Sequence, residues 1–245
     1  MMNLFLTLTL WLYFTLGFVC FFAPFYLAAI LFSPNREIAF QKLNHRFYRI
    51  FFRIIRLFIP ALNLHIDKRA LAIRSSVIIC NHLSFLDPLL LISMFARHKT
   101  IVKSNFFKIP IFGQMLKAAG YIPSAALGKS NTLMIQQIEG LPAYLQAGGN
   151  FFVFPEGTRS RNRKLGQFNP GAFKIARLCR TPVKVLFIRH TDTLFKPGKF
   201  LFNTHPQPIT VSLIGSLNPD YDSADFTISA LITQTRNLMQ REMQR

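Results

Sequence analysis

The sequence predicts an α/β fold in which helices flank a mixed, largely parallel β-sheet, with a membrane-embedded helical segment at the N-terminus. Two observations carry this prediction. From residue 76 onward, short apolar runs with strand character alternate with stretches of helical periodicity, and residues 1–34 contain no charged side chain. A chain of 245 residues suits one domain with a single core. We therefore expect a membrane-embedded helix or kinked helical pair at 1–34, a basic amphipathic interfacial helix at 35–60, and one globular domain at 61–245.

The uncharged N-terminal segment is longer than the roughly 20 apolar residues that cross a bilayer. Pro24 divides it, so one kinked helix and a short re-entrant pair are both compatible with the sequence. A cleaved signal peptide is not favoured, because the leader carries no basic side chain. Cationic residues follow soon after Pro34, and the positive-inside tendency places the remaining chain on the cytoplasmic side of a membrane, which we expect to be a bacterial inner membrane.

Residues 40–59 predict an amphipathic helix with one strongly basic face. The basic side chains recur at intervals of four, three, four and three, namely Lys42, Arg46, Arg49, Arg53 and Arg56. The opposite face is apolar and consists of Phe47, Phe51, Ile54, Ile55 and Phe58. We favour a helix that lies among lipid headgroups and pairs its arginines with phosphates. The alternative is a helix that covers the domain core and leaves its basic face in solvent.

The charge balance indicates an anionic partner, because 29 Lys and Arg against 10 Asp and Glu give a formal charge of +19. No nucleic-acid recognition motif accompanies this charge, so we expect membrane phospholipids and no nucleic acid as partners. Cys20, Cys80 and Cys179 show neither disulfide nor zinc spacing. No metal site and no bound cofactor are predicted, and every histidine except His82 is assigned to a surface or packing position.

The alternation of patterns is clear enough to place the elements of the domain. Strands are expected at 76–80, 100–103, 151–154, 183–188 and 209–214, and helices at 87–97, 111–120, 130–147, 171–179 and 223–245. Functional groups in such sheets collect where the parallel strands end. Two polar motifs of this chain directly follow predicted strands.

The first motif, NHLSFLDP, begins where the strand at 76–80 ends. His82 and Asp87 are five residues apart, and a loop that turns into a helix can bring the carboxylate back onto one imidazole nitrogen. Such a pair fixes the tautomer, stabilises the imidazolium and leaves the other nitrogen free to accept a hydroxyl proton. The alternative is that Asp87 and Pro88 form only the N-cap and first position of a helix.

The second motif, FPEGTRSR, begins at the end of the predicted strand 151–154. It gathers Glu156, Gly157, Thr158 and Arg159 in one tight loop. Arginine is suited to a bidentate grip on phosphate, and glycine lets backbone N–H groups approach an anion. The motif therefore predicts an anion site, with a solvated loop and an internal Glu–Arg pair as the alternative.

Together the two motifs resemble the glycerolipid acyltransferase family that includes the 1-acylglycerol-3-phosphate acyltransferases. The resemblance extends from Ser76 to Ile188. The family's first block is matched by Asn81, His82 and Asp87, and its third block by Phe154 through Ser160 without a substitution. Further matches are Lys103 with the run KIPIFG, Gly171 and Ala172 at a small-residue helix start, and Thr181, Pro182 and Val183 in the fourth block.

This resemblance implies a membrane-bound O-acyltransferase of phospholipid biosynthesis. The acyl donor is expected to be an acyl-carrier-protein or coenzyme A thioester, used as a co-substrate. The expected acceptor is a lysophospholipid, above all 1-acyl-sn-glycerol-3-phosphate, which becomes phosphatidate. His82 is expected to act as the general base and Asp87 to orient it. The residues implied in substrate binding are Asn81, Lys103, Glu156, Gly157, Thr158 and Arg159.

One departure from the family pattern concerns the acceptor. The family's second block has an arginine where GYIPSAA places Ala126. Either Lys129 substitutes for that arginine, or the acceptor is another hydroxylated amphiphile, such as a lyso-ornithine lipid or a specialised lipid intermediate. A serine hydrolase is disfavoured because Ser84 does not stand in a G-x-S-x-G elbow. A non-catalytic, lipid-binding membrane adaptor is disfavoured because it has no need of both intact blocks.

Overall fold

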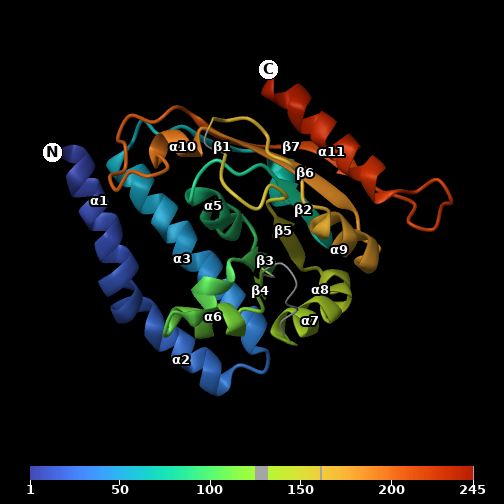
Figure 1. Cartoon of the computed structure of the whole chain (residues 1–245). Helices are drawn as coiled ribbons and strands as arrows, with labels where there is room; N and C mark the ends of the chain where they lie inside the picture. Colours follow the sequence, from blue (N-terminus) through green and yellow to red (C-terminus); the bar gives the residue numbers. More distant parts are fainter. Residues whose placement is uncertain (125–131, 161, 245) are drawn as a thin grey trace.

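The computed structural model describes residues 1–124, 132–160 and 162–244, and in this part of the chain seven strands form one sheet (Figure 1). The strands are β1 (Leu64–Ile66), β2 (Ser76–Cys80), β3 (His98–Val102), β4 (Ile122–Pro123), β5 (Asn150–Val153), β6 (Val183–Arg189) and β7 (Ile209–Leu217), in the spatial order β1-β7-β6-β2-β5-β3-β4. Neighbouring strands run parallel except β6 and β7, which are antiparallel. The predicted mixed, largely parallel sheet is therefore confirmed.

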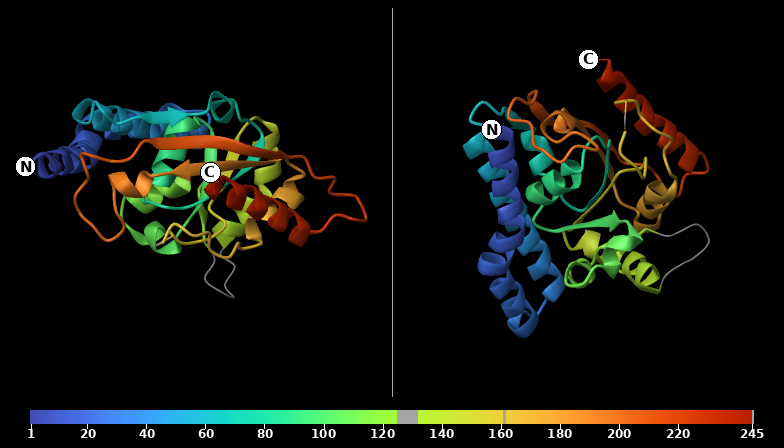
Figure 2. Two further views of the ribbon diagram at one scale, coloured as in Figure 1. Left: turned by 90° about the horizontal axis from the view of Figure 1, so that it is seen from above. Right: turned by 60° about the vertical axis from the view of Figure 1, so that its left-hand side comes forward.

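Helices cover both faces of this sheet (Figures 1 and 2). Those of the domain are α4 (Lys68–Leu71), α5 (Leu86–Met94), the 3₁₀ turn η2 (Ser104–Lys108), α6 (Phe112–Ala118), α7 (Thr132–Glu139), α8 (Leu141–Gln146), α9 (Gly171–Cys179), α10 (Thr191–Leu194) and α11 (Ile228–Met243). The central strand β2 is buried throughout. Its alternate residues enter two different apolar cores: Ile78 faces the core that contains α5, and Val77 and Ile79 face the core that contains α8, α9 and α11.

Several details of the element assignment differ from the prediction. The C-terminal helix, expected from residue 223, begins at Ile228, and the short helices α4, η2 and α10 were not predicted. The single helix expected at 130–147 is two helices, α7 and α8, separated at Gly140, with Pro142 in the first turn of α8. Proline is favourable there, because the first-turn N–H has no partner within its own helix. The edge strands β1 and β4 were not predicted. They are three and two residues long, and strands so short carry no measurable alternation.

The apolar N-terminal segment forms one bent helical run and not a re-entrant pair. The helices α1 (Met2–Leu12) and α2 (Ala23–Phe32) are joined without a gap by a π-helix, η1 (Tyr13–Phe22). Figure 1 shows the bend between η1 and α2, where Pro24 lies in the first turn. Residues 2–32 are long and apolar enough to cross a membrane, and most of their side chains are exposed rather than packed in the protein.

Helix α3 (Arg36–Phe58) runs back alongside this segment, as Figure 1 shows. Its first turn is capped by Asn35, whose Oδ1 accepts a hydrogen bond from Ile38 N at 3.0 Å. The five predicted basic side chains of its polar face are all exposed. The opposite face differs from the interfacial prediction: Phe47, Phe51 and Ile55 are buried in the protein core with residues of α1, α2 and α5. The predicted apolar face of α3 therefore packs against the protein core.

Hydrogen bonds attach the N-terminal helix to the rest of the protein at several points along its length. Thr7 Oγ1 accepts from Phe202 N at 2.9 Å, and Tyr13 Oη donates to the Phe47 carbonyl at 2.7 Å. Further along, Tyr26 Oη donates to Asn44 Oδ1 inside the core. Because these bonds join η1 and α2 to α3 and α1 to the segment before β7, the N-terminal helix and the rest of the protein form one packed unit.

Candidate active site

The two motifs meet where three neighbouring strands end. In the order β6-β2-β5, the first motif follows β2, the second follows β5, and β6 ends on the other side of β2. These strands are parallel, so their carboxyl ends share one edge of the sheet. The motifs are more than 60 residues apart in the sequence and become adjacent only through this pairing.

His82 and Asp87 form the pair that their spacing predicts. His82 Nδ1 lies 2.9 Å from Asp87 Oδ2, and the Asp87 side chain is fully buried while that of His82 is 16% exposed. Helix α5 begins at Leu86, so Asp87 stands in its first turn and points back to the loop before it. The N-cap of α5 is Phe85, and Asp87 is therefore not the helix cap.

Hydrogen bonds fix both oxygens of the Asp87 carboxylate. Its Oδ2 also accepts hydrogen bonds from Leu83 N at 2.6 Å and from Ser84 N at 2.7 Å. Its Oδ1 accepts from the hydroxyl of Thr191, at the start of α10. With these donors in place the carboxylate has one orientation, and that orientation fixes the imidazole.

The pairing assigns a role to each imidazole nitrogen of His82. An ionised carboxylate only accepts hydrogen bonds, so Nδ1 carries the proton that Asp87 accepts, and Nε2 is left with a free lone pair. The ring also stacks on Phe154, with ring centroids 4.2 Å apart and planes inclined by 22°. The imidazole is therefore a fixed, partly exposed base.

Two other candidate nucleophiles beside His82 are unsuited to attack. Ser84 is fully buried, and its hydroxyl donates to the Phe195 carbonyl at 3.0 Å. Burial, together with the nearby carboxylates of Asp87 and Glu156, raises the pKa of the Cys80 thiol well above its usual range. A buried neutral thiol is a poor nucleophile. This geometry disfavours a covalent serine or cysteine mechanism.

The carboxylate of Glu156, which was predicted to bind substrate, accepts hydrogen bonds from the backbone. Its Oε1 accepts from His82 N at 3.1 Å, and its Oε2 accepts from Gly166 N at 2.8 Å. The backbone N–H of Ser160 donates in turn to the His82 carbonyl at 2.8 Å. Both carboxylate oxygens thus face backbone donors, and their charge would repel an anionic ligand. Glu156 thus links the two motifs through hydrogen bonds to the backbone.

Asn81, which was also predicted to bind substrate, makes its hydrogen bonds within the fold. It is 2% exposed, and its side chain pairs with both backbone groups of Ile188: Asn81 Nδ2 donates to the carbonyl at 2.8 Å, and Ile188 N donates to Oδ1 at 2.7 Å. This reciprocal pair joins the ends of β2 and β6. The Asn81 side chain has a structural function, because its amide is occupied by the backbone.

The remaining residues of the second motif form an exposed turn. Gly157 has φ +65°, in the left-handed region that glycine adopts freely, and its N–H donates to the Phe154 carbonyl at 3.1 Å. Thr158 and Arg159 are exposed, and among the described residues neither side chain makes a hydrogen bond or an ion pair. A free guanidinium and hydroxyl beside a glycine turn suit an anionic ligand.

Lys103 lies at the end of β3, the strand next to β5, and is exposed. It therefore stands at the same edge of the sheet as the glycine turn. The second-block positions Ala126 and Lys129 lie outside the described residues.

Two contributors to the site were not predicted: Thr191, which holds Asp87, and Gly166, which holds Glu156. Neither residue belongs to a recognisable motif, and Thr191 lies 104 residues from Asp87 in the sequence.

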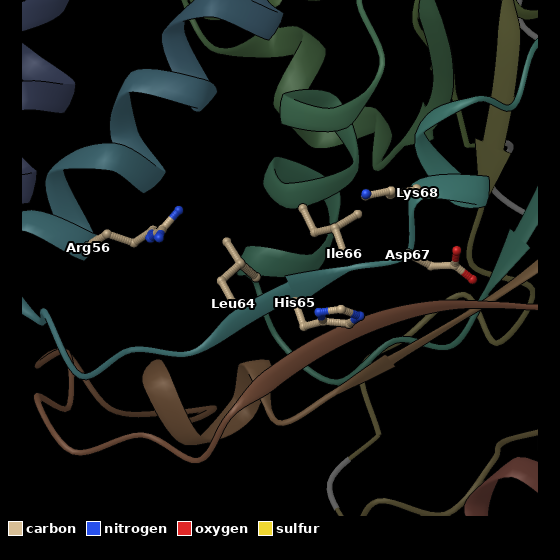
Figure 3. Close-up of a pocket in the computed structure, with 6 residues that line it drawn as sticks. All are labelled: Arg56, Leu64, His65, Ile66, Asp67 and Lys68. Carbon is tan, nitrogen blue, oxygen red and sulfur yellow. The ribbon is translucent and has the colours of Figure 1, made fainter.

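One cavity in the described part of the chain adjoins the site, and a larger one lies away from it. A cavity of about 210 Å³ adjoins the site and is lined by residues of both motifs, of β6 and of α11, among them Asn81, Glu156, Ser160, Arg163, Arg189 and Met243. A larger open cavity of about 600 Å³ lies between α3 and β1, where Arg56 and Lys68 face the gap above Leu64 and Ile66 (Figure 3). The larger cavity contains none of the predicted site residues. No group of three or more metal-ligating side chains occurs in the described part of the chain.

Comparisons with known proteins agree with this geometry. A sequence model of the family described as Acyltransferase matches residues 62–189. A probable 1-acyl-sn-glycerol-3-phosphate acyltransferase of Mycoplasma pneumoniae is 30% identical over 202 residues, with 74% of each chain covered. The chloroplastic 1-acyl-sn-glycerol-3-phosphate acyltransferases of Brassica napus and Arabidopsis thaliana are 32% and 35% identical over about half of this chain, which spans only 35% and 33% of their lengths.

The fold itself has a solved counterpart. The crystal structure of the 1-acyl-sn-glycerophosphate (LPA) acyltransferase PlsC from Thermotoga maritima superposes with a TM-score of 0.72 and 22% sequence identity. The alignment covers 98% of this chain and 95% of that one, so the likeness includes the N-terminal helices as well as the sheet.

Proposed function

This chain belongs to the acyltransferase family, and on that premise we propose that it is an O-acyltransferase that moves a fatty acyl group from a thioester to the hydroxyl of a lysophospholipid. One observation above all supports the proposal: the buried Asp87 holds the His82 ring with Nε2 free, beside an exposed turn that carries Arg159. A base and an anion-binding turn on neighbouring strand ends suit an acceptor that has both a hydroxyl and a phosphate.

The proposed reaction needs no covalent enzyme intermediate. His82 Nε2 removes the proton of the acceptor hydroxyl while its oxygen attacks the thioester carbonyl. The resulting tetrahedral species expels the thiolate, which takes the proton back from the imidazolium, so that an ester and a thiol leave. Asp87 stabilises the imidazolium while it exists. General-base help of this kind contributes about 10²–10⁴-fold.

The proposed acceptor is 1-acyl-sn-glycerol-3-phosphate, and the product is phosphatidate. Thr158 and Arg159 are free to bind its phosphate, with backbone N–H groups of the turn at Gly157 and with Lys103 from the next strand. The donor is an acyl-carrier-protein or coenzyme A thioester and acts as a co-substrate. The 1-acyl-sn-glycerol-3-phosphate acyltransferases among the relatives support this acceptor.

We propose further that the N-terminal helix lies along the membrane surface, on its cytoplasmic side. The helix exposes large apolar side chains such as Leu16, Phe21 and Phe25. Its Tyr13 and Tyr26 are also hydrogen-bonded to α3 and its Thr7 to Phe202, and a helix that crossed the bilayer would carry these partners into hydrocarbon. The exposed basic row of α3 then faces lipid phosphates.

The test is acyl transfer by the purified, detergent-solubilised protein. Wild type, His82→Ala and the control His65→Ala, an exposed histidine on β1, are compared with both thioester donors against lysophosphatidate and other lyso-lipids. We expect product from lysophosphatidate that is lost in His82→Ala and kept in His65→Ala. Product only from another lyso-lipid, such as a lyso-ornithine lipid, would change the acceptor and keep the chemistry. No product from any acceptor would favour a lipid-binding adaptor.

A further inference from the structure

The C-terminal helix α11 reaches the active-site region although it lies outside the residues 62–189 that match the family. Thr227 caps its first turn, and Leu231, Thr235 and Met239 are buried along its inner face. Beside this inner face, Arg236 is half-buried against the loop that follows the second motif. Figure 2 shows α11 crossing the edge of the molecule next to this loop.

Arg236 makes a set of contacts that only an arginine provides. Its Nη1 donates to the Gly166 carbonyl at 2.6 Å and its Nη2 to the Leu165 carbonyl at 3.4 Å. The guanidinium also lies over the ring of Phe168, with its carbon 5.4 Å from the ring centroid. The planar fork binds two successive carbonyls and stacks on an aromatic face at the same time.

The contacts of Arg236 continue to the catalytic histidine. The Leu165 carbonyl belongs to the same peptide unit as Gly166 N–H, which donates to Glu156 Oε2 at 2.8 Å. Glu156 Oε1 accepts from His82 N at 3.1 Å. A Cβ at position 166 would lie 3.2 Å from Glu156 Oε2, so glycine permits this close approach. Arg236 thus acts on His82 through one peptide unit and one carboxylate.

A second contact fixes the far end of α11. Arg189, the last residue of β6, donates from Nη2 to the Glu242 carbonyl and to Glu242 Oε1, the latter at 3.0 Å. Next to Glu242, Met243 lines the 210 Å³ cavity together with Glu156 and Leu165. Helix α11 is therefore attached to the end of β6, the strand end to which Asn81 also binds. This attachment holds Arg236 at a fixed distance from the loop that contains Leu165 and Gly166.

We propose that Arg236 is a positioning residue of the acyl-transfer site: through the Leu165–Gly166 peptide it fixes Glu156, and Glu156 fixes the backbone of His82. This inference rests on the proposed acyltransferase function. Small displacements of a catalytic group lower turnover steeply, so we expect Arg236→Met to reduce kcat about tenfold. The KM for the lysophospholipid should stay the same, because the anion-binding turn at Arg159 is not touched.

The experiment measures kcat, KM and melting temperature for Arg236→Met, Arg236→Lys and Arg241→Met in the full-length protein with a coenzyme A thioester and lysophosphatidate. Arg241 is an exposed arginine of the same helix, and its side chain makes no hydrogen bond or ion pair to a described residue. Arg241→Met should match wild type. Arg236→Lys keeps one donor but loses the fork, and we expect it to lose only about threefold in kcat.

A double-mutant cycle with Glu156→Gln distinguishes positioning from general stability. If Arg236 acts through Glu156, its replacement should cost less than about twofold once Glu156 is changed, compared with tenfold alone. Wild-type kcat in Arg236→Met, or a full tenfold loss in the Glu156→Gln background, would overturn the inference. If Arg236→Met melts below the assay temperature, the same cycle with Arg236→Lys decides. Wild-type protein without any transferase activity would instead refute the proposed function.

Discussion

Replacing Asp87 by asparagine removes the charge behind His82 and keeps the hydrogen bonds around it. An amide oxygen in the place of Oδ2 still accepts from the His82 ring and from the N–H groups of Leu83 and Ser84. The amide NH₂ in the place of Oδ1 can donate to the Thr191 hydroxyl, whose direction of hydrogen bonding reverses. Alanine would instead leave these donors unpaired in a fully buried position, at roughly 1–3 kcal/mol each.

We therefore expect Asp87→Asn to lower the rate of catalysis and to leave the stability of the fold unchanged. Without the carboxylate, no negative charge stabilises the imidazolium that forms when Nε2 takes the acceptor's proton. We expect kcat to fall by about 10²–10⁴-fold, the range attributed to a working general base. This corresponds to about 2.7–5.5 kcal/mol of lost transition-state stabilisation. The melting temperature should change little.

The assay is steady-state acyl transfer to lysophosphatidate, with thermal unfolding measured on the same preparations. Asp87→Asn, His82→Ala and the double variant are compared. Because the two residues act as a unit, the double variant should be no slower than His82→Ala alone. A kcat of Asp87→Asn within about threefold of wild type would refute the assignment of Asp87 as the partner of a general base.

Three further predictions each concern one side chain. Asn81→Ala leaves two buried backbone groups of Ile188 unpaired and should lower the free energy of unfolding by about 2–4 kcal/mol; an unchanged melting temperature would contradict this. Burial lowers the pKa of His98 from 6.5 to about 3, so its stabilisation is present above pH 6.5 and is lost as the pH falls toward 3, by up to about 1.4 kcal/mol per unit. His98→Gln should flatten that part of the stability profile. Arg53→Gln should weaken sedimentation with anionic vesicles about fivefold at low salt, while Lys174→Gln on α9, at the opposite face of the sheet, should not.

Most of the fold follows from patterns that the sequence displays directly. The buried strand β2 is a continuous apolar run, and the basic spacing of α3 is regular enough to fix which side chains are exposed. The partner of the apolar face of α3 could not be read from the sequence, because lipid and a protein core select the same residues. The structure shows Phe51 and Ile55 packed in protein, so α3 presents its arginine row outside the core, together with the exposed Ile50 and Leu57.

Contacts of the site between residues close in sequence could be predicted, whereas contacts between residues far apart in sequence could not. His82 and Asp87 are close in sequence, and the loop between them leaves few other conformations for the carboxylate. Thr191 reaches Asp87 from 104 residues away, and Arg236 reaches the Gly166 carbonyl from 70 residues away. Contacts of this kind come from the order of strands in the sheet and from the path of the C-terminal helix. Neither follows from a motif.

The side chains of the second motif fall into two groups that differ in burial, and the sequence does not separate them. Glu156 turns inward to backbone donors, whereas Thr158 and Arg159 remain exposed and free. The proposed substrate-binding groups therefore all lie on the β5 and β3 side of His82. The acceptor's phosphate at Arg159 and its hydroxyl at His82 Nε2 are therefore expected to be held from two neighbouring strand ends, β5 and β2. A headgroup whose anion lies far from its hydroxyl would then need a different anchor.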